Sequence, residues 1–169
     1  MSSMPSSGRA STPGLLFAVF ISVFIAFVLT VVHLPNWLFY FWPEWIVIVV
    51  AYWGLVAPKR FGPIAGFIIG TLLEVLFVRK FGVLGLGLGT VTFLVNSISL
   101  QLRALSIWQQ MISIGFLIAL FKLLTGWLSG LVSAYTITTE YWYSIVGTVL
   151  IWPFAFILLE ELRRVMRIR

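Results

Sequence analysis

The sequence has no cysteine and no aspartate, and its single histidine is His33. Without cysteine there is no disulfide, no thiolate nucleophile and no cysteine metal site. Without aspartate and with one histidine, the chain also lacks the groups for a Ser-His-Asp triad or a metal cluster. We therefore predict no catalytic residue, no metal site and no cofactor.

Charged residues are scarce as well. Only 9% of the 169 residues are charged, whereas 61% are hydrophobic. A soluble domain carries roughly 25% charged residues, so this chain lacks the polar side chains that would cover a globule. The composition therefore predicts an integral membrane protein.

Six apolar stretches each approach the roughly 20 residues that a helix needs to cross a bilayer. No small-x-small cleavage site follows the first stretch, so we expect a retained span rather than a signal peptide. We predict an all-α integral membrane protein with six transmembrane helices over residues 15–32, 38–57, 63–78, 81–102, 107–135 and 142–159. The predicted units are a flexible cytoplasmic tail over 1–14, a six-helix transmembrane domain over 15–160 and a basic cytoplasmic tail over 161–169.

The distribution of lysine and arginine predicts that both termini are cytoplasmic. In that orientation the outer loops hold only Arg79 and Lys80, and Lys122 lies within a span. The basic residues on the cytoplasmic side are then Arg9, Lys59, Arg60, Arg103, Arg163, Arg164, Arg167 and Arg169. The net charge of +6 thus reflects topology and attraction to anionic lipid, not nucleic-acid binding.

Aromatic residues gather on the predicted outer side, in "NWLFYFWPEW" (36–45) and "YWYS" (141–144). Belts of Trp and Tyr are typical of membrane interfaces. The density of the first cluster, which includes Trp42 and Trp45, leaves open an additional role in docking a partner.

Two helices are predicted to carry a glycine track in line with a charge. In "GPIAGFIIGTLLE" (62–74) glycine recurs every four residues, at Gly62, Gly66 and Gly70. The next position at this interval is an acid, Glu74. On another span the same interval joins Lys122, Gly126 and Gly130. Residues four apart share one face of a helix, and small residues there let helices approach closely in lipid.

The sequence leaves three hypotheses open for the acid of the first track. Spans 63–78 and 107–135 could pack together and pair Glu74 with Lys122, since both charges lie at similar predicted depth. Alternatively, Lys122 reaches toward the interface, and Glu74 pairs locally with Arg79 or Lys80. A third hypothesis makes Glu74 a proton or cation site of a transporter.

Several segments, in this order, resemble the rod shape-determining protein MreD family. The longest is "FWPEWIVIVVAYWGLVAPKRFGPIAGFIIGTLLE", with its Pro-x-Trp entry, Tyr-Trp pair and Pro-Lys-Arg turn. "LSIWQQ" (105–110) resembles the opening of the fifth span, and "VLIWPF" (149–154) before a basic tail resembles the last span. The resemblance covers residues 35 to 167.

The resemblance implies a non-enzymatic scaffold of the bacterial cell-elongation complex in the inner membrane. It implies association with MreC, and through the complex with MreB, RodA and a class B penicillin-binding transpeptidase. It also implies a six-helix fold similar to the substrate-binding components of energy-coupling vitamin transporters. A small transporter or substrate-capture subunit is therefore the alternative function. A homo-oligomer is left open.

Overall fold

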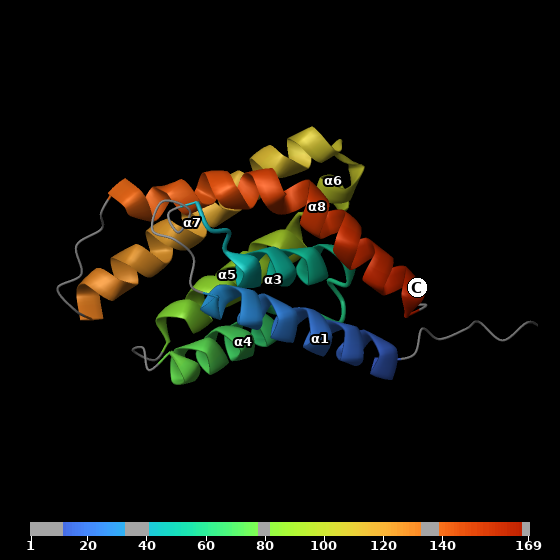
Figure 1. Cartoon of the computed structure of the whole chain (residues 1–169), viewed down its shortest axis with the longest axis horizontal. Helices are drawn as coiled ribbons and strands as arrows, with labels where there is room; N and C mark the ends of the chain where they lie inside the picture. The colour runs from blue at the N-terminus through green and yellow to red at the C-terminus, as the bar shows by residue number, and fades with distance from the viewer. Residues whose placement is uncertain (1–11, 33–40, 78–81, 133–138, 167–169) are drawn as a thin grey trace, which may run out of the picture.

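The computed structural model describes residues 12–32, 41–77, 82–132 and 139–166, which form helices and turns without a β-strand (Figure 1). The elements are α1 (Thr12–Val31), α3 (Trp45–Val56), α4 (Pro63–Leu76), α5 (Val83–Ser97), α6 (Ser99–Ala104), α7 (Ile107–Val132), the short 3-10 helix η1 (Thr139–Trp142) and α8 (Tyr143–Val165). The predicted tail 1–14 lies largely outside the described residues, whereas the described part of the predicted tail 161–169 belongs mostly to the end of α8.

Three of these helices, α1, α7 and α8, are long and apolar enough to cross a membrane. The other apolar helices are shorter: α3 has 12 residues, α4 has 14 and α5 has 15. Within the described part of the predicted span 38–57, residues 41–57, the helix begins at Trp45, and the predicted span 81–102 is divided at Ile98 into α5 and α6. The structure confirms the all-helical, apolar architecture, while the number of spans stays a prediction.

Successive long elements run in opposite directions along the longest axis of the molecule (Figure 1). The start of α1 and the end of α8 lie at the same end, as do the α3–α4 turn and α6. In this view α3 lies in the middle, with α1 and α4 below it and α7 and α8 above. The helices therefore form an up-and-down bundle around α3.

The central helix α3 is buried on every side. All its residues from Ile46 to Leu55 are buried, and Tyr52 and Trp53 are fully enclosed. Its sequence, "WIVIVVAYWGLV", is apolar around the whole circumference, which is the pattern of a core helix. On α1, the small residues Ala18, Ser22 and Ala26 form the buried stripe that faces the core.

The glycine track of α4 packs against α5. A Cβ atom at Gly70 would lie 2.5 Å from the carbonyl oxygen of Leu84 and 2.6 Å from the Cα atom of Gly85. One at Gly66 would lie 2.7 Å from the carbonyl oxygen of Leu88. These neighbours are backbone atoms that cannot rotate away, so both positions require glycine for the observed helix separation.

The prediction that span 63–78 packs on span 107–135 is wrong. Helix α5 lies between α4 and α7 and packs on both. At its contact with α7, a Cβ atom at Gly87 would lie 2.6 Å from the Cγ2 atom of Thr125. Glycine tracks indicate that a close helix contact exists, but they do not identify the partner helix.

The other glycines of the two predicted tracks differ in their surroundings. Gly126 is buried on α7. By contrast, a Cβ atom at Gly62 or Gly130 would have no atom within 4 Å among its described surroundings. The described contacts at these two positions therefore do not require glycine.

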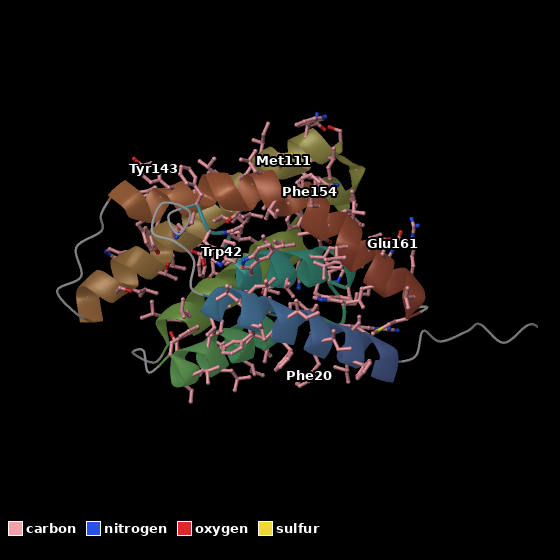
Figure 2. All side chains as sticks on the ribbon, in the orientation of Figure 1. Phe20, Trp42, Met111, Tyr143, Phe154 and Glu161 are labelled. Atoms are coloured by element: carbon pink, nitrogen blue, oxygen red, sulfur yellow. The ribbon has the colours of Figure 1, made fainter. Side chains whose placement is uncertain are left out.

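Helix α8 changes direction along its course (Figure 1). It contains Pro153, and the neighbouring Phe154 is labelled close to the bend in Figure 2. Proline removes one helical hydrogen bond and pushes against the preceding turn, which kinks a helix. The bend allows α8 to follow α3, and Trp152 is fully buried on its inner face.

We predict that Gly70→Ala destabilises the protein by roughly 1–3 kcal/mol, because the added methyl group overlaps backbone atoms of α5. Gly130→Ala is the matched control, since its methyl group meets nothing within 4 Å, and its effect should stay within about 0.5 kcal/mol. Thermal denaturation of the purified variants in mild detergent measures both. Equal midpoints for the two variants would contradict the close α4–α5 contact.

Candidate functional site: polar contacts inside the bundle

The structure places Lys122 of α7 against Glu44, which directly precedes α3. The Lys122 Nζ atom lies 2.8 Å from the Glu44 Oε1 atom. The lysine side chain is buried, whereas the glutamate side chain is about one-third exposed, at 35%. A charge at this depth is costly unless it is paired, so this contact explains how α7 can hold a lysine among apolar residues.

Tyr141 is a second described contact of the lysine. The Lys122 Nζ atom lies 3.9 Å from the centroid of the Tyr141 ring, a cation–π contact. The Tyr141 hydroxyl donates to the Lys122 carbonyl oxygen at 3.2 Å and lies 3.0 Å from the Thr125 hydroxyl. The ammonium group thus has a carboxylate and an aromatic face as partners in place of water.

The segment before α3 is also attached to α8. The Glu44 backbone N–H donates to the Thr148 hydroxyl at 3.0 Å, and the Ser144 hydroxyl donates to the Glu44 carboxylate at 3.5 Å. A side chain at Gly147 would collide with the Phe41 carbonyl oxygen, so this segment lies directly on the backbone of α8. We call Glu44, Lys122, Thr125, Tyr141, Ser144 and Thr148 the outer polar cluster.

Glu74, the second buried charge, caps the start of α5. Its carboxylate accepts hydrogen bonds from the backbone N–H of Gly82, at 2.6 Å, and from that of Leu84. The residue is completely buried. The first N–H groups of a helix have no partner within it, and the helix dipole favours negative charge there. Gly82 adopts a positive φ of 97°, which lets the chain turn back tightly enough to meet the acid.

The hypothesis that Glu74 pairs with Lys122 is therefore wrong for this structure. The acid serves the neighbouring helix in sequence, and the lysine pairs with a glutamate that precedes α3. The local alternative involves Arg79 and Lys80, which lie outside the described residues. The hypothesis that Lys122 reaches toward the interface stays a prediction, and the lysine side chain is buried at its ion pair with Glu44.

The opposite end of α3 and the turn after it are held by residues of α5 and α6. The Arg103 Nε atom donates to the Leu55 carbonyl oxygen at 2.8 Å, and its Nη2 atom donates to the Val56 carbonyl oxygen at 2.7 Å. Asn96 donates to the carbonyl oxygens of Pro58 and Phe61 in the next turn. A cation at the last carbonyls satisfies their hydrogen bonds and complements the helix dipole.

The two glutamines of "LSIWQQ" shape the corner between α6 and α7. Gln109 accepts a hydrogen bond from the Ser106 backbone N–H at 3.1 Å, as in a capping box. Gln110 is buried and donates to the carbonyl oxygens of Leu102 and Leu105. The motif thus fixes the start of α7 relative to α6.

The Tyr-Trp pair in the middle of α3 reaches two different helices. The Tyr52 hydroxyl donates to the Glu160 carboxylate on α8 at 2.9 Å, and Glu160 also pairs with Arg163. The Trp53 indole N–H donates to the Ser22 hydroxyl on α1 at 2.8 Å. Tyr52 and Trp53 therefore each bond to the helix that covers them, whereas the buried Trp45 indole nitrogen has no hydrogen-bond partner among the described residues.

Two of the three tryptophans of the predicted outer aromatic cluster, Trp42 and Trp45, lie within the described residues. The Trp42 indole N–H donates to the Leu29 carbonyl oxygen of α1 at 3.0 Å, and the rings of Trp42 and Trp45 meet edge to face, with centroids 5.6 Å apart. Phe41 stacks on Tyr143 of α8. These contacts account for packing, and a role in partner docking stays a prediction.

Four contributors to this arrangement were missed in the sequence: the charged residues Glu44 and Arg103, and the glutamines Gln109 and Gln110. A signal existed for Gln109, because Ser106 and Gln109 have the spacing of a capping box. The two charged residues depend on long-range packing, since Arg103 binds carbonyl groups and Glu44 binds a lysine distant in sequence.

These features define an α-helical membrane protein whose described buried charges hold helices together. A sequence model of the rod shape-determining protein MreD family matches residues 12–162. The rod shape-determining protein MreD of Haemophilus influenzae is 31% identical over 145 residues, covering 83% of this chain and 86% of the relative. The chain therefore belongs to the MreD family, and this membership supports a role in determining rod shape.

No solved structure matches the chain. The predicted similarity to the substrate-binding components of energy-coupling vitamin transporters thus stays a prediction.

We predict strong coupling between Glu44→Gln and Lys122→Met in a double-mutant cycle, on the order of 1–3 kcal/mol, because the two side chains form one ion pair. The control cycle combines Glu74→Gln with Lys122→Met, and its effects should add within about 0.5 kcal/mol. The free energy of unfolding in mixed micelles measures both cycles. Additive effects in the first cycle and coupling in the second would restore the original Glu74–Lys122 hypothesis.

Proposed function

We propose that the protein is a non-enzymatic scaffold that helps to determine rod shape in the inner membrane of a bacterium. The observation that carries this proposal is the family match, which extends over most of the chain. The relative in Haemophilus influenzae, aligned over most of both chains, carries the same name. Family membership favours a structural role over an enzymatic one.

The structure supports a six-span topology with both termini in the cytoplasm. Six elements alternate in direction along one axis, which suits six crossings by α1, α3, α4, α5, α7 and α8 (Figure 1). The described basic residues other than Lys122 belong to the α3–α4 turn, α6 and the end of α8, which lie at one end of the molecule. The positive-inside rule assigns that end to the cytoplasm.

The chemistry of the buried polar groups suits a scaffold. Glu74, Lys122 and Arg103 contact backbone groups or charges of neighbouring helices, so their described contacts fix the positions of helices. A rigid bundle presents the same outer surface to its partners at all times, which lowers the entropic cost of assembly. This is the property that a scaffold requires.

We propose MreC as the direct partner, with MreB, RodA and a class B penicillin-binding transpeptidase reached through the assembly. The protein would thereby help to couple MreB to peptidoglycan synthesis. The exposed apolar side chains of α1, α4, α7 and α8 offer membrane-embedded surface for such contacts. They also allow self-association, so a homo-oligomer belongs to the same proposal.

Depletion of the protein in its native bacterium tests the function. We expect rod-shaped cells to become round, and we expect mild-detergent purification of the tagged protein to recover MreC after crosslinking. A depleted strain complemented with Gly130→Ala should keep its shape, because that substitution meets open space. Unchanged cell shape with impaired nutrient uptake would favour the transporter alternative.

A further inference from the structure

Helix α4 forms an edge of the bundle, and its apolar surface is unusually short along the helix axis. It packs along α5, and its opposite face carries exposed apolar residues. Ile64 is 75% exposed and Leu72 is 63% exposed, and the set is completed by Phe67, Ile68, Val75 and Leu76. In the proposed topology this face meets lipid. The inference that follows rests on that membrane placement, but not on any protein partner.

The α4 edge is too short for a bilayer of ordinary thickness. Its 14 residues extend about 21 Å at 1.5 Å per residue, whereas a hydrocarbon core is roughly 30 Å thick. Tilting a helix shortens its projection on the membrane normal and cannot lengthen it. Helix α5, with 15 residues, is hardly longer and exposes Leu86 and Phe93 beside α4. The shortage along α4 is therefore at least about 9 Å at every tilt.

Charged residues prevent the adjoining chain from making up the difference. Lys59 and Arg60, both exposed, lie in the turn before α4. Arg79 and Lys80 follow it closely in the sequence. Basic side chains are attracted to phosphate and anionic headgroups, so Lys59 and Arg60 favour placing a headgroup layer close to the start of α4. After α4, the sequence offers only two apolar residues, 77 and 78, before the next basic pair.

The exposed apolar surface of α7 is longer along its helix axis than that of α4. Its exposed apolar stripe extends from Trp108, which is 72% exposed, to Leu131, about 34 Å along the helix axis. The stripe also contains Ile112, Phe116, Leu123 and Trp127. Tilting the helix reduces the projection of this length on the membrane normal, so that it matches the hydrocarbon thickness of an ordinary bilayer. One molecule thus presents a short apolar edge and a long one.

We propose that the α4 edge is a lipid-binding surface that thins the bilayer locally and selects phospholipids with short acyl chains. The α7 edge lies in bilayer of full thickness and shows no such preference. Mismatch costs a fraction of a kcal/mol per Å, so lipids that reduce it accumulate at the edge where it arises. The protein would therefore hold a gradient of membrane thickness around itself.

The absence of cysteine from the chain provides a direct test. Ile68→Cys on α4 and Phe116→Cys on α7 each carry a bimane fluorophore on an exposed, mid-helix position of the full-length protein. The two variants are reconstituted in vesicles that mix myristoleoyl and erucoyl phosphatidylcholine, and each lipid is brominated in turn to quench neighbouring fluorophores. Leu72→Cys serves as a second α4 position in case Ile68→Cys folds poorly.

We expect the short-chain lipid to be enriched at least about twofold beside the α4 fluorophore and to match its bulk fraction beside α7. Equal quenching profiles at the two positions would overturn the inference and leave the proposed function intact. Quenching at α7 but not at α4 would also overturn it, because a protein or a second copy would then cover α4. Absence of quenching at both positions would refute the membrane placement itself.

Discussion

A helix enclosed on all sides must satisfy its terminal peptide groups from the helices around it, and α3 is in this position. No water reaches its carbonyl groups from a membrane core, and an unsatisfied buried polar group costs several kcal/mol there. Glu44, the residue before its start, is held by Thr148 and Lys122, and its last carbonyls are held by Arg103. The positions of α7, α8 and α6 around α3 follow from these contacts.

The apolar residues of α3 alone would not fix these positions. Lipid chains are as apolar as leucine, so helices in a membrane associate through close packing and polar contacts instead. The bundle uses both means. Gly66 and Gly70 bring the backbones of α4 and α5 together, while Glu74 sets the register of the same pair by capping α5. A misplaced α5 would leave this carboxylate buried without donors.

This construction agrees with a protein that organises other proteins. The described buried charges have partners that are structural, and the Tyr-Trp pair of α3 connects α8 with α1. Membership in the rod shape-determining family is therefore matched by a bundle built for rigidity. The apolar surfaces of the α4 and α7 edges differ in length. Under the inference drawn above, the proposed scaffold would therefore also arrange the lipid around it.

The sequence predicted the membrane class, the family and most helices, because long apolar stretches, glycine spacing and motif order are local properties. It predicted wrongly which helices meet. Glu74 and Lys122 share a depth, but α5 separates their helices, and only the three-dimensional packing reveals this. Residue Glu44 was assigned to the interior of a long span, whereas α3 begins at Trp45 and places the acid beside α7.

The enclosure of α3 is the central claim, and labelling from the lipid phase tests it most directly. A membrane-soluble diazirine reagent is photolysed with the reconstituted protein, and modified residues are located by mass spectrometry. The account predicts modification of exposed residues such as Ile64 and Ile112, and none between Ile46 and Leu55. Modification of α3 as strong as that of α4 would contradict it.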